Sequence, residues 1–173
     1  MEDFKTPART AISILVDNHY GVLARISNMF NRRSFNIDSI SASATMDPAI
    51  TRITITVHEE PQALNQILLQ TARLEEVRQV FVLDPARSLE RELLLVKVAA
   101  DSSNRTALHE ISDIYKAKII DLSPGSMVFE LTGTPEKVDA FLAMFEGYSI
   151  LELCRTGITA IERGPVQEHV KPE

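Results

Sequence analysis

Alternation of apolar and polar side chains is strictest in Thr51-Arg52-Ile53-Thr54-Ile55-Thr56-Val57, which predicts a half-buried β-strand. The same period of two runs through Phe35-Asn36-Ile37-Asp38-Ser39-Ile40-Ser41-Ala42. Between the two runs lies Met46-Asp47-Pro48-Ala49, whose residue types favour a turn. We therefore predict that the two strands form a hairpin.

Further elements flank this hairpin on both sides. Before it, residues 10–16 are mostly β-branched and apolar, which favours a strand. A helix should follow Gly21, because apolar residues then recur at helical spacing: Val22, Leu23, Ile26, Met29 and Phe30. After the hairpin, Pro61 suits the first turn of a second helix, and residues 77–83 form another apolar strand. The order is strand, helix, strand, strand, helix, strand.

The same order recurs in the second half of the chain. Strands are predicted at 92–98, 118–122, 127–131 and 150–161, with helices at about 104–115 and from Thr134-Pro135 onward. We therefore predict the α+β class, with two tandem ferredoxin-like βαββαβ modules. The expected boundaries are a flexible arm at 1–9, a first module at 10–84, a linker at 85–90, a second module at 91–163 and a tail at 164–173.

Composition excludes several classes of protein. The 173 residues carry a net charge of −6, and Lys and Arg are scattered, so no basic face for nucleic acid is expected. No apolar run approaches the roughly 20 residues of a membrane span, and the N-terminus lacks a signal-peptide pattern. The single cysteine, Cys154, lies in an apolar run and is predicted to be a buried structural thiol. We expect a cytoplasmic protein, since a reducing compartment suits a chain without disulfides.

Motifs for catalysis are missing from the sequence. There is no Gly-rich phosphate loop, no His-Glu-x-x-His and no Gly-x-Ser-x-Gly motif. The four histidines are far apart in sequence: His19, His58, His109 and His169. Because an active site needs a converging set of groups, we expect no catalytic residue, no metal site and no enzymatic activity of the chain itself.

The loop Asp17-Asn18-His19-Tyr20-Gly21 leads directly into the first predicted helix. Free backbone N–H groups at a helix N-terminus attract anions, including carboxylates. Gly21 would let a ligand approach the backbone without a Cβ in the way, and Asn18 adds an amide. A plain turn that needs glycine for its dihedral angles explains the same residues, and spacing alone favours that explanation.

Three other polar sites have both a functional and a structural explanation. Asn36 follows the first helix, where its amide could meet a ligand or satisfy its own backbone. Gln66 lies on the second helix, where a solvated polar face is the plain explanation. Arg155-Thr156-Gly157 could contact a partner or form a bulge in a long strand.

Strings in both halves resemble a known family. Residues 17–26, 30–40 and 48–56 resemble an ACT domain, the amino-acid-sensing module of many metabolic enzymes. In the second half, residues 91–98, 118–122, 132–141 and 155–158 are similar to strings of the acetolactate synthase (acetohydroxyacid synthase) regulatory small subunit family. The resemblance spans about residues 10–163 and implies that the first module is an ACT domain.

The resemblance also implies a function. Members of this family have no activity of their own, and they activate a thiamine-diphosphate-dependent catalytic large subunit that condenses two 2-keto acids. Valine, or another branched-chain amino acid, binds the ACT domains of many members and inhibits the complex. The chain would form a homodimer in branched-chain amino acid biosynthesis. Thiamine diphosphate, Mg²⁺ and FAD are expected in the catalytic partner, and no cofactor is expected in this chain.

Effector-binding positions follow from the same resemblance. Asn18, Gly21, Val22 and Leu23 would contact the effector from one chain. Asn36 and Ile37 would contact it from the neighbouring chain. Ser43 and Gln66 match positions linked to the effector response.

The sequence departs from the family at the ends of the first helix. Ser34 stands where glycine is usual, and a left-handed Ser costs something like 1 kcal/mol relative to Gly. His19-Tyr20 replaces the common Glu/Lys-Pro/Ser. These departures bear on which effector binds and how tightly. The alternative function is a free-standing tandem ACT regulator without a catalytic partner, which the second-half strings argue against.

Overall fold

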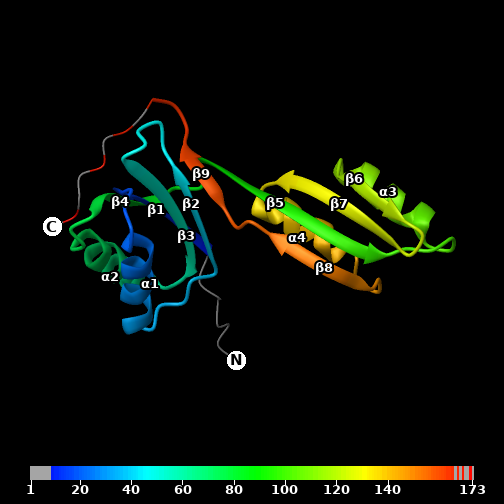
Figure 1. Ribbon diagram of the computed structural model, residues 1–173, viewed down its shortest axis with the longest axis horizontal. Coiled ribbons are helices and arrows are strands. Elements are labelled where there is room, and N and C mark those ends of the chain that lie inside the picture. Colours follow the sequence, from blue (N-terminus) through cyan, green and yellow to red (C-terminus); the bar gives the residue numbers. More distant parts are fainter. Residues whose placement is uncertain (1–8, 166, 168, 170–171, 173) are drawn as a thin grey trace. The chain divides into compact units, whose positions relative to one another are not determined.

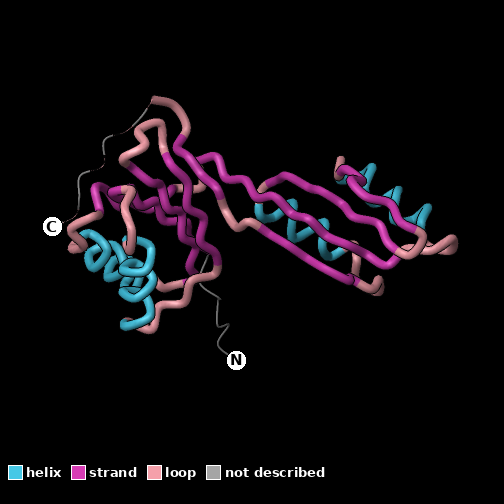
Figure 2. Tube along the Cα trace, in the orientation of Figure 1, coloured by secondary structure: helices cyan, strands magenta, loops and turns pink. Residues whose placement is uncertain are grey.

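The computed structural model describes residues 9–165, 167, 169 and 172, and these form two compact units (Figure 1). The first unit takes residues from 1–89 and 157–173, and the second consists of 90–156. The first sheet has four strands and the second has five. Each is antiparallel with two helices on one face, which confirms the two predicted βαββαβ modules (Figure 2). Most of the predicted arm at 1–9 lies outside the described residues, and Arg9 already belongs to the first strand.

The first sheet has the strand order β2-β3-β1-β4. Its elements are β1 (Arg9–Asp17), α1 (Val22–Arg32), β2 (Ser39–Ala44), β3 (Ile50–His58), α2 (Pro61–Ala72) and β4 (Val77–Leu83). The predicted hairpin is present, with Ser39 opposite Thr56 and Ala44 opposite Thr51. Pro61 occupies the first turn of α2, as expected from its fixed φ.

The strand predicted at 35–42 begins four residues later, at Ser39. Ser34 has a φ of 57°, and the N–H of Phe35 bonds to the carbonyl of Phe30, so this segment still closes the end of α1. The Phe35 ring meets Phe30 edge-on, with 6.3 Å between ring centroids. Phe35 and Ile37 therefore pack on the core without lying in the strand, which explains their alternating pattern.

Apolar side chains of β1 and β3 pack against the two helices. Ile12 and Ile14 of β1 are fully buried, as are Ile26 of α1 and Ile67 of α2. Each such side chain contributes about 1.5–3 kcal/mol by leaving water. Both faces of β1 are buried, because a second cluster consisting of Ala11, Leu83, Ile158 and Ala160 covers the other side.

The chain after residue 156 supplies that cover. The single strand predicted at 150–161 is divided into β8 (Ile150–Arg155) and β9 (Thr159–Glu162), with Gly157 between them at a φ of +76°. Ile158 and Ala160 belong to the core of the first unit. By their contacts, residues 157–163, which were predicted to end the second module, group with the first unit.

The second sheet has the strand order β6-β7-β5-β8, and β9 also pairs with β5. Its elements are β5 (Ser88–Ala99), α3 (Arg105–Tyr115), β6 (Lys118–Ser123), β7 (Ser126–Gly133), α4 (Pro135–Ala143) and β8. Thr134 caps α4 by accepting a hydrogen bond from the Lys137 N–H, as its sequence predicts. Because β5 already begins at Ser88, the predicted linker at 85–90 shortens to a turn around Asp84, which accepts from the N–H groups of Ala86 and Arg87.

Cys154 is exposed, so the prediction of a buried thiol is wrong. It pairs with Leu95, whose neighbours Leu94 and Val96 point to the helices. Since side chains alternate along a strand, Cys154 lies on the sheet face that α3 and α4 do not cover. The apolar run around it belongs to an edge strand, and this explains the error.

We predict that Gly157→Ala destabilises the first unit. A Cβ at this position would lie 2.4 Å from the Cβ of Ser39 and would be strained by the positive φ. Overpacking costs about 1–3 kcal/mol and the left-handed conformation about 1 kcal/mol. The free energy of unfolding, measured by urea denaturation with circular dichroism, should therefore fall by about 2–4 kcal/mol.

Gly164→Ala is the matched control. Its φ is +80°, but a Cβ there meets nothing within 4 Å. This variant should lose only about 1 kcal/mol. Equal losses in the two variants would show that Ser39 does not confine Gly157.

Candidate functional site

The loop from Asn18 to Gly21 is fixed against the turn between β2 and β3. The Asn18 N–H donates to the carbonyl of Ala49, and its side-chain Nδ2 donates to the carbonyl of Pro48, each over 2.8 Å. Gly21 is the N-cap of α1, in the left-handed region at φ 88° and ψ −12°. Its backbone conformation therefore favours glycine, as the explanation of the loop as a plain turn requires.

The same glycine also leaves the start of α1 accessible. A Cβ on Gly21 would meet nothing within 4 Å, so the space in front of the backbone is open. Within the described part of the chain no side chain caps this helix. Its first backbone bond runs from the Arg25 N–H to the Gly21 carbonyl, so the N–H groups before Arg25 lack helical acceptors. This geometry suits a carboxylate.

Glu76 holds the loop from the opposite side. Its backbone carbonyl accepts from the Asp17 N–H at 2.9 Å, and its carboxylate accepts from the Arg25 guanidinium. Only 8% of the Glu76 side chain is exposed, so removing Arg25 would leave a buried carboxylate without its ion-pair partner. Arg78 donates to the Asp17 carboxylate at 2.7 Å and adds a further link. The start of α1 is thus attached to the end of β1 and to the start of β4.

Val22 and Leu23 occupy different environments at the start of α1. Val22 is 4% exposed and belongs to the core, whereas Leu23 is 47% exposed. Leu23 is therefore free to contact an apolar ligand, and Val22 anchors the turn from which the N–H groups project.

Asn36 and Ile37 lie at the far end of α1 from Gly21. Asn36 is exposed and donates to Asp38 over 3.3 Å, and Ile37 packs partly against the core. The 11 residues of α1 span about 16 Å at 1.5 Å per residue. A single chain therefore does not bring Gly21 and Asn36 to the same small ligand.

Ser43 and Gln66 are also exposed. Ser43 lies on β2 opposite Arg52, near the turn that Asn18 contacts. Gln66 lies in the middle of α2. The structure thus places Ser43 toward the Gly21 end of the unit and Gln66 on the exposed face of α2.

Arg155 is occupied within the second unit. Its guanidinium donates to Glu92 and to Asp139, each over 2.6 Å. Burial lowers the pKa of Arg155, but the hydrogen bonds with Asp139 and Glu92 outweigh it and raise the pKa above its ordinary value. Through these bonds Arg155 joins β8 to β5 and α4, which gives it a structural role within the unit.

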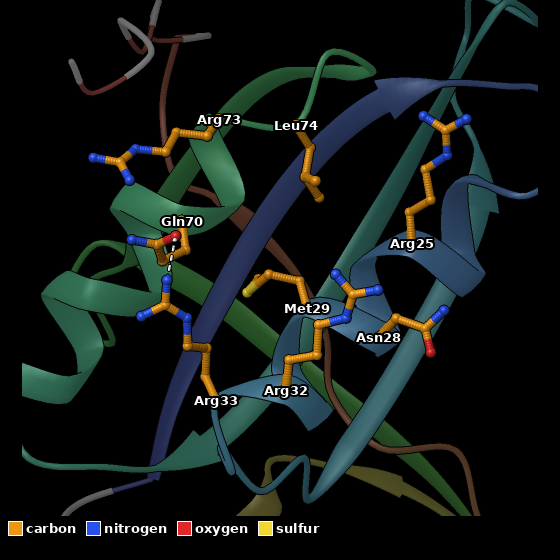
Figure 3. A pocket seen from close by; sticks show the side chains of 8 residues that line it. All are labelled: Arg25, Asn28, Met29, Arg32, Arg33, Gln70, Arg73 and Leu74. Atoms are coloured by element: carbon orange, nitrogen blue, oxygen red, sulfur yellow. Dashed lines mark hydrogen bonds between the residues drawn. The ribbon is translucent and has the colours of Figure 1, made fainter.

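A basic groove between α1 and α2 was missed by sequence reasoning (Figure 3). It has a volume of about 410 Å³, and four arginines line it: Arg25, Arg32, Arg33 and Arg73. The basic residues that are scattered in sequence are gathered here by the packing of two helices. The spacing of Arg25 and Arg32, seven residues apart on one helical face, is the signal that could have revealed it.

Two classes of site find no support in the described residues. No three His, Cys, Asp or Glu side chains in that part of the chain lie together as metal ligands. No helix among the described elements is long and apolar enough to cross a membrane.

Comparison with known proteins covers both units. The family described as small subunit of acetolactate synthase matches residues 91–164, and the ACT domain described as AHAS small subunit-like matches residues 12–79. The acetolactate synthase small subunit of Mycolicibacterium smegmatis is 41% identical over 160 residues, covering 92% of this chain and 94% of that relative. The Haemophilus influenzae small subunit is 38% identical over 157 residues, covering 90% and 96%.

A solved structure agrees with these relatives. The crystal structure of the acetolactate synthase small subunit from Thermotoga maritima superposes with a TM-score of 0.83 at 35% identity. The match covers 92% of this chain and 99% of that one.

Proposed function

The chain belongs to the acetolactate synthase small subunit family, and on that premise we propose that it activates a separate catalytic large subunit and makes it sensitive to valine or a related branched-chain amino acid. The observation that carries the proposal is the match of both units to this family over nine-tenths of the chain. The match over 91–164 favours this function over that of a free-standing ACT regulator. Thiamine diphosphate, Mg²⁺ and FAD belong to the partner on this proposal, and the complex is cytoplasmic.

The effector site is proposed at the start of α1. The effector carboxylate would accept from the N–H groups that precede Arg25, helped by the helix dipole. The open space at Gly21 supports this placement, and the exposed Leu23 supplies an apolar contact for a branched side chain.

A second copy of the chain would complete the site. β2 is an edge strand, so its outer N–H and C=O groups are open to pairing. Antiparallel pairing of two β2 strands about a two-fold axis brings the start of one strand beside the end of the other. Asn36 and Ile37 precede the start of β2, and the Asn18 loop contacts the turn after its end. A homodimer built in this way supplies Gly21 from one chain and Asn36 from the other.

Reconstitution tests the proposed activity. Alone, the chain should bind neither thiamine diphosphate nor flavin and make no acetolactate from pyruvate. Added to its cognate catalytic subunit, it should raise the rate of acetolactate formation severalfold. An unchanged rate at saturating small subunit would argue against a small-subunit role.

Gly21→Asp should abolish inhibition by valine while the complex is still activated. The new carboxylate would lie beside the effector carboxylate, and two such charges about 4 Å apart repel by roughly 4 kcal/mol at an effective dielectric near 20. That energy weakens binding by nearly a thousandfold. The measurement is a valine inhibition curve on the reconstituted complex.

Gly147→Asp is the control for this variant. Gly147 has the same φ of +88° and the same free space around its Cβ position, but it lies in the second unit. It should carry the same backbone cost and added charge with an unchanged inhibition midpoint. If Gly21→Asp also leaves the midpoint unchanged, the effector binds elsewhere.

Mixing two damaged chains tests whether the site is shared. Gly21→Asp and Asn36→His chains should each give a valine-insensitive complex as homodimers. In a mixed dimer one site carries both changes, and the other combines a native Gly21 with a native Asn36. Mixed samples refolded together should therefore regain valine binding at up to one site per mixed dimer, measured by calorimetry. A site contained in one chain would show no recovery.

A further inference from the structure

The groove between α1 and α2 presents more positive charge than its surroundings neutralise. The chain as a whole carries a charge of −6, yet four guanidinium groups line this one groove (Figure 3). Glu76 binds Arg25, and Gln70 accepts from Arg33 over 3.1 Å. The side chains of Arg32 and Arg73 form no hydrogen bond or ion pair with any described residue.

Helix dipoles explain only part of this arrangement. Arg32 ends α1 and Arg73 is the C-cap of α2, and a cation near a helix C-terminus gains about 0.3–1 kcal/mol. The dipole does not account for Arg25, one turn into α1, or for the hollow that separates the helices. Glu75, next to this cluster, is exposed and forms no ion pair with these arginines in the described part of the chain.

The floor of the groove is apolar. Met29 of α1 and Leu74 after α2 are half-buried there, beneath the arginine side chains. An apolar floor with a cationic rim matches a protein segment that carries acidic side chains around an apolar one. Guanidinium groups bind carboxylates in bidentate geometry, and arginine is enriched at protein interfaces. All four arginines are exposed and therefore accessible to such a partner.

We propose that this groove docks an acidic segment of the catalytic large subunit. The inference rests on the proposed function and names the surface through which it acts. Arg25 lines the groove and also binds Glu76, whose backbone holds the loop before α1. The docking surface and the start of α1 thus share one helix, so that effector binding and docking act on the same element.

Charge reversal in the groove tests the proposal. The variant Arg32→Glu/Arg73→Glu leaves the ion pair between Arg25 and Glu76 intact and changes the net charge from −6 to −10. The control Arg87→Glu/Arg91→Glu makes the same change at two exposed arginines outside the groove. Binding to the catalytic subunit is measured directly by calorimetry, and activation is measured in parallel.

The groove variant should bind the catalytic subunit at least tenfold more weakly, and the control should stay within twofold of the native chain. The neutral variant Arg32→Gln/Arg73→Gln should lie between them. Native affinity should fall as salt rises from 50 to 200 mM, because exposed charges are screened over about 10 Å. The groove variant should lose most of that dependence. Equal unfolding midpoints in urea should show that all variants fold.

Each other outcome is decisive. If the native chain binds and activates the catalytic subunit but the groove variant binds equally well, the groove is not the docking surface. Equal weakening by the control would also overturn the proposal, since total charge would then explain the effect. If the native chain binds no catalytic subunit, the proposed function fails first. Tight binding of labelled single-stranded RNA that only the groove variant loses, with docking unchanged, would reassign the groove to nucleic acid.

Discussion

Strand β1 is buried on both of its faces, and the first unit is arranged around that constraint. Ile12 and Ile14 face the helices, while Ala11 and Ser13 are equally buried on the opposite side. Burying a hydroxyl is costly unless it is hydrogen-bonded, and Ser13 accepts from the Arg52 guanidinium over 3.0 Å. The first unit has helices on only one face of its sheet, so the segment after residue 156 must return to cover part of the other face.

Glu76 links strand β1 to the start of α1. A buried carboxylate without a partner is strongly unfavourable, so Glu76 must hold Arg25. Because the same residue binds Asp17 through its carbonyl, the end of β1 and the first turn of α1 are fixed together. A loop held in this way keeps its N–H groups in place before any ligand arrives, and a preorganised site loses less entropy on binding.

Sequence periodicity predicted both modules. Apolar side chains recur every two residues in a strand and about every 3.6 residues in a helix, so the period identifies both the element and its buried face. Periodicity placed the start of β2 too early. Phe35 and Ile37 alternate and pack on the core like strand residues, but they precede the hydrogen-bonded strand. It also assigned Cys154 to a core, since an apolar run does not reveal whether helices cover its face. Gly21 was found from its place before a helix, and its effector role, with those of Asn36 and Gln66, stays a prediction. The arginine groove depends on two helices meeting, and the spacing of Arg25 and Arg32 indicates only the part of it that lies on α1.

The return of the chain to the first unit has a consequence for how the modules can be separated. Residues 90–156 are inserted between two parts of one folded body, so the chain crosses the boundary twice. A single proteolytic nick at either crossing leaves the halves covalently joined. A gene fragment that ends at residue 89 would encode an ACT module with Leu83 and Ala11 uncovered. A complete first module therefore needs the segment after residue 156, either with the second module present or with that segment joined directly after residue 89.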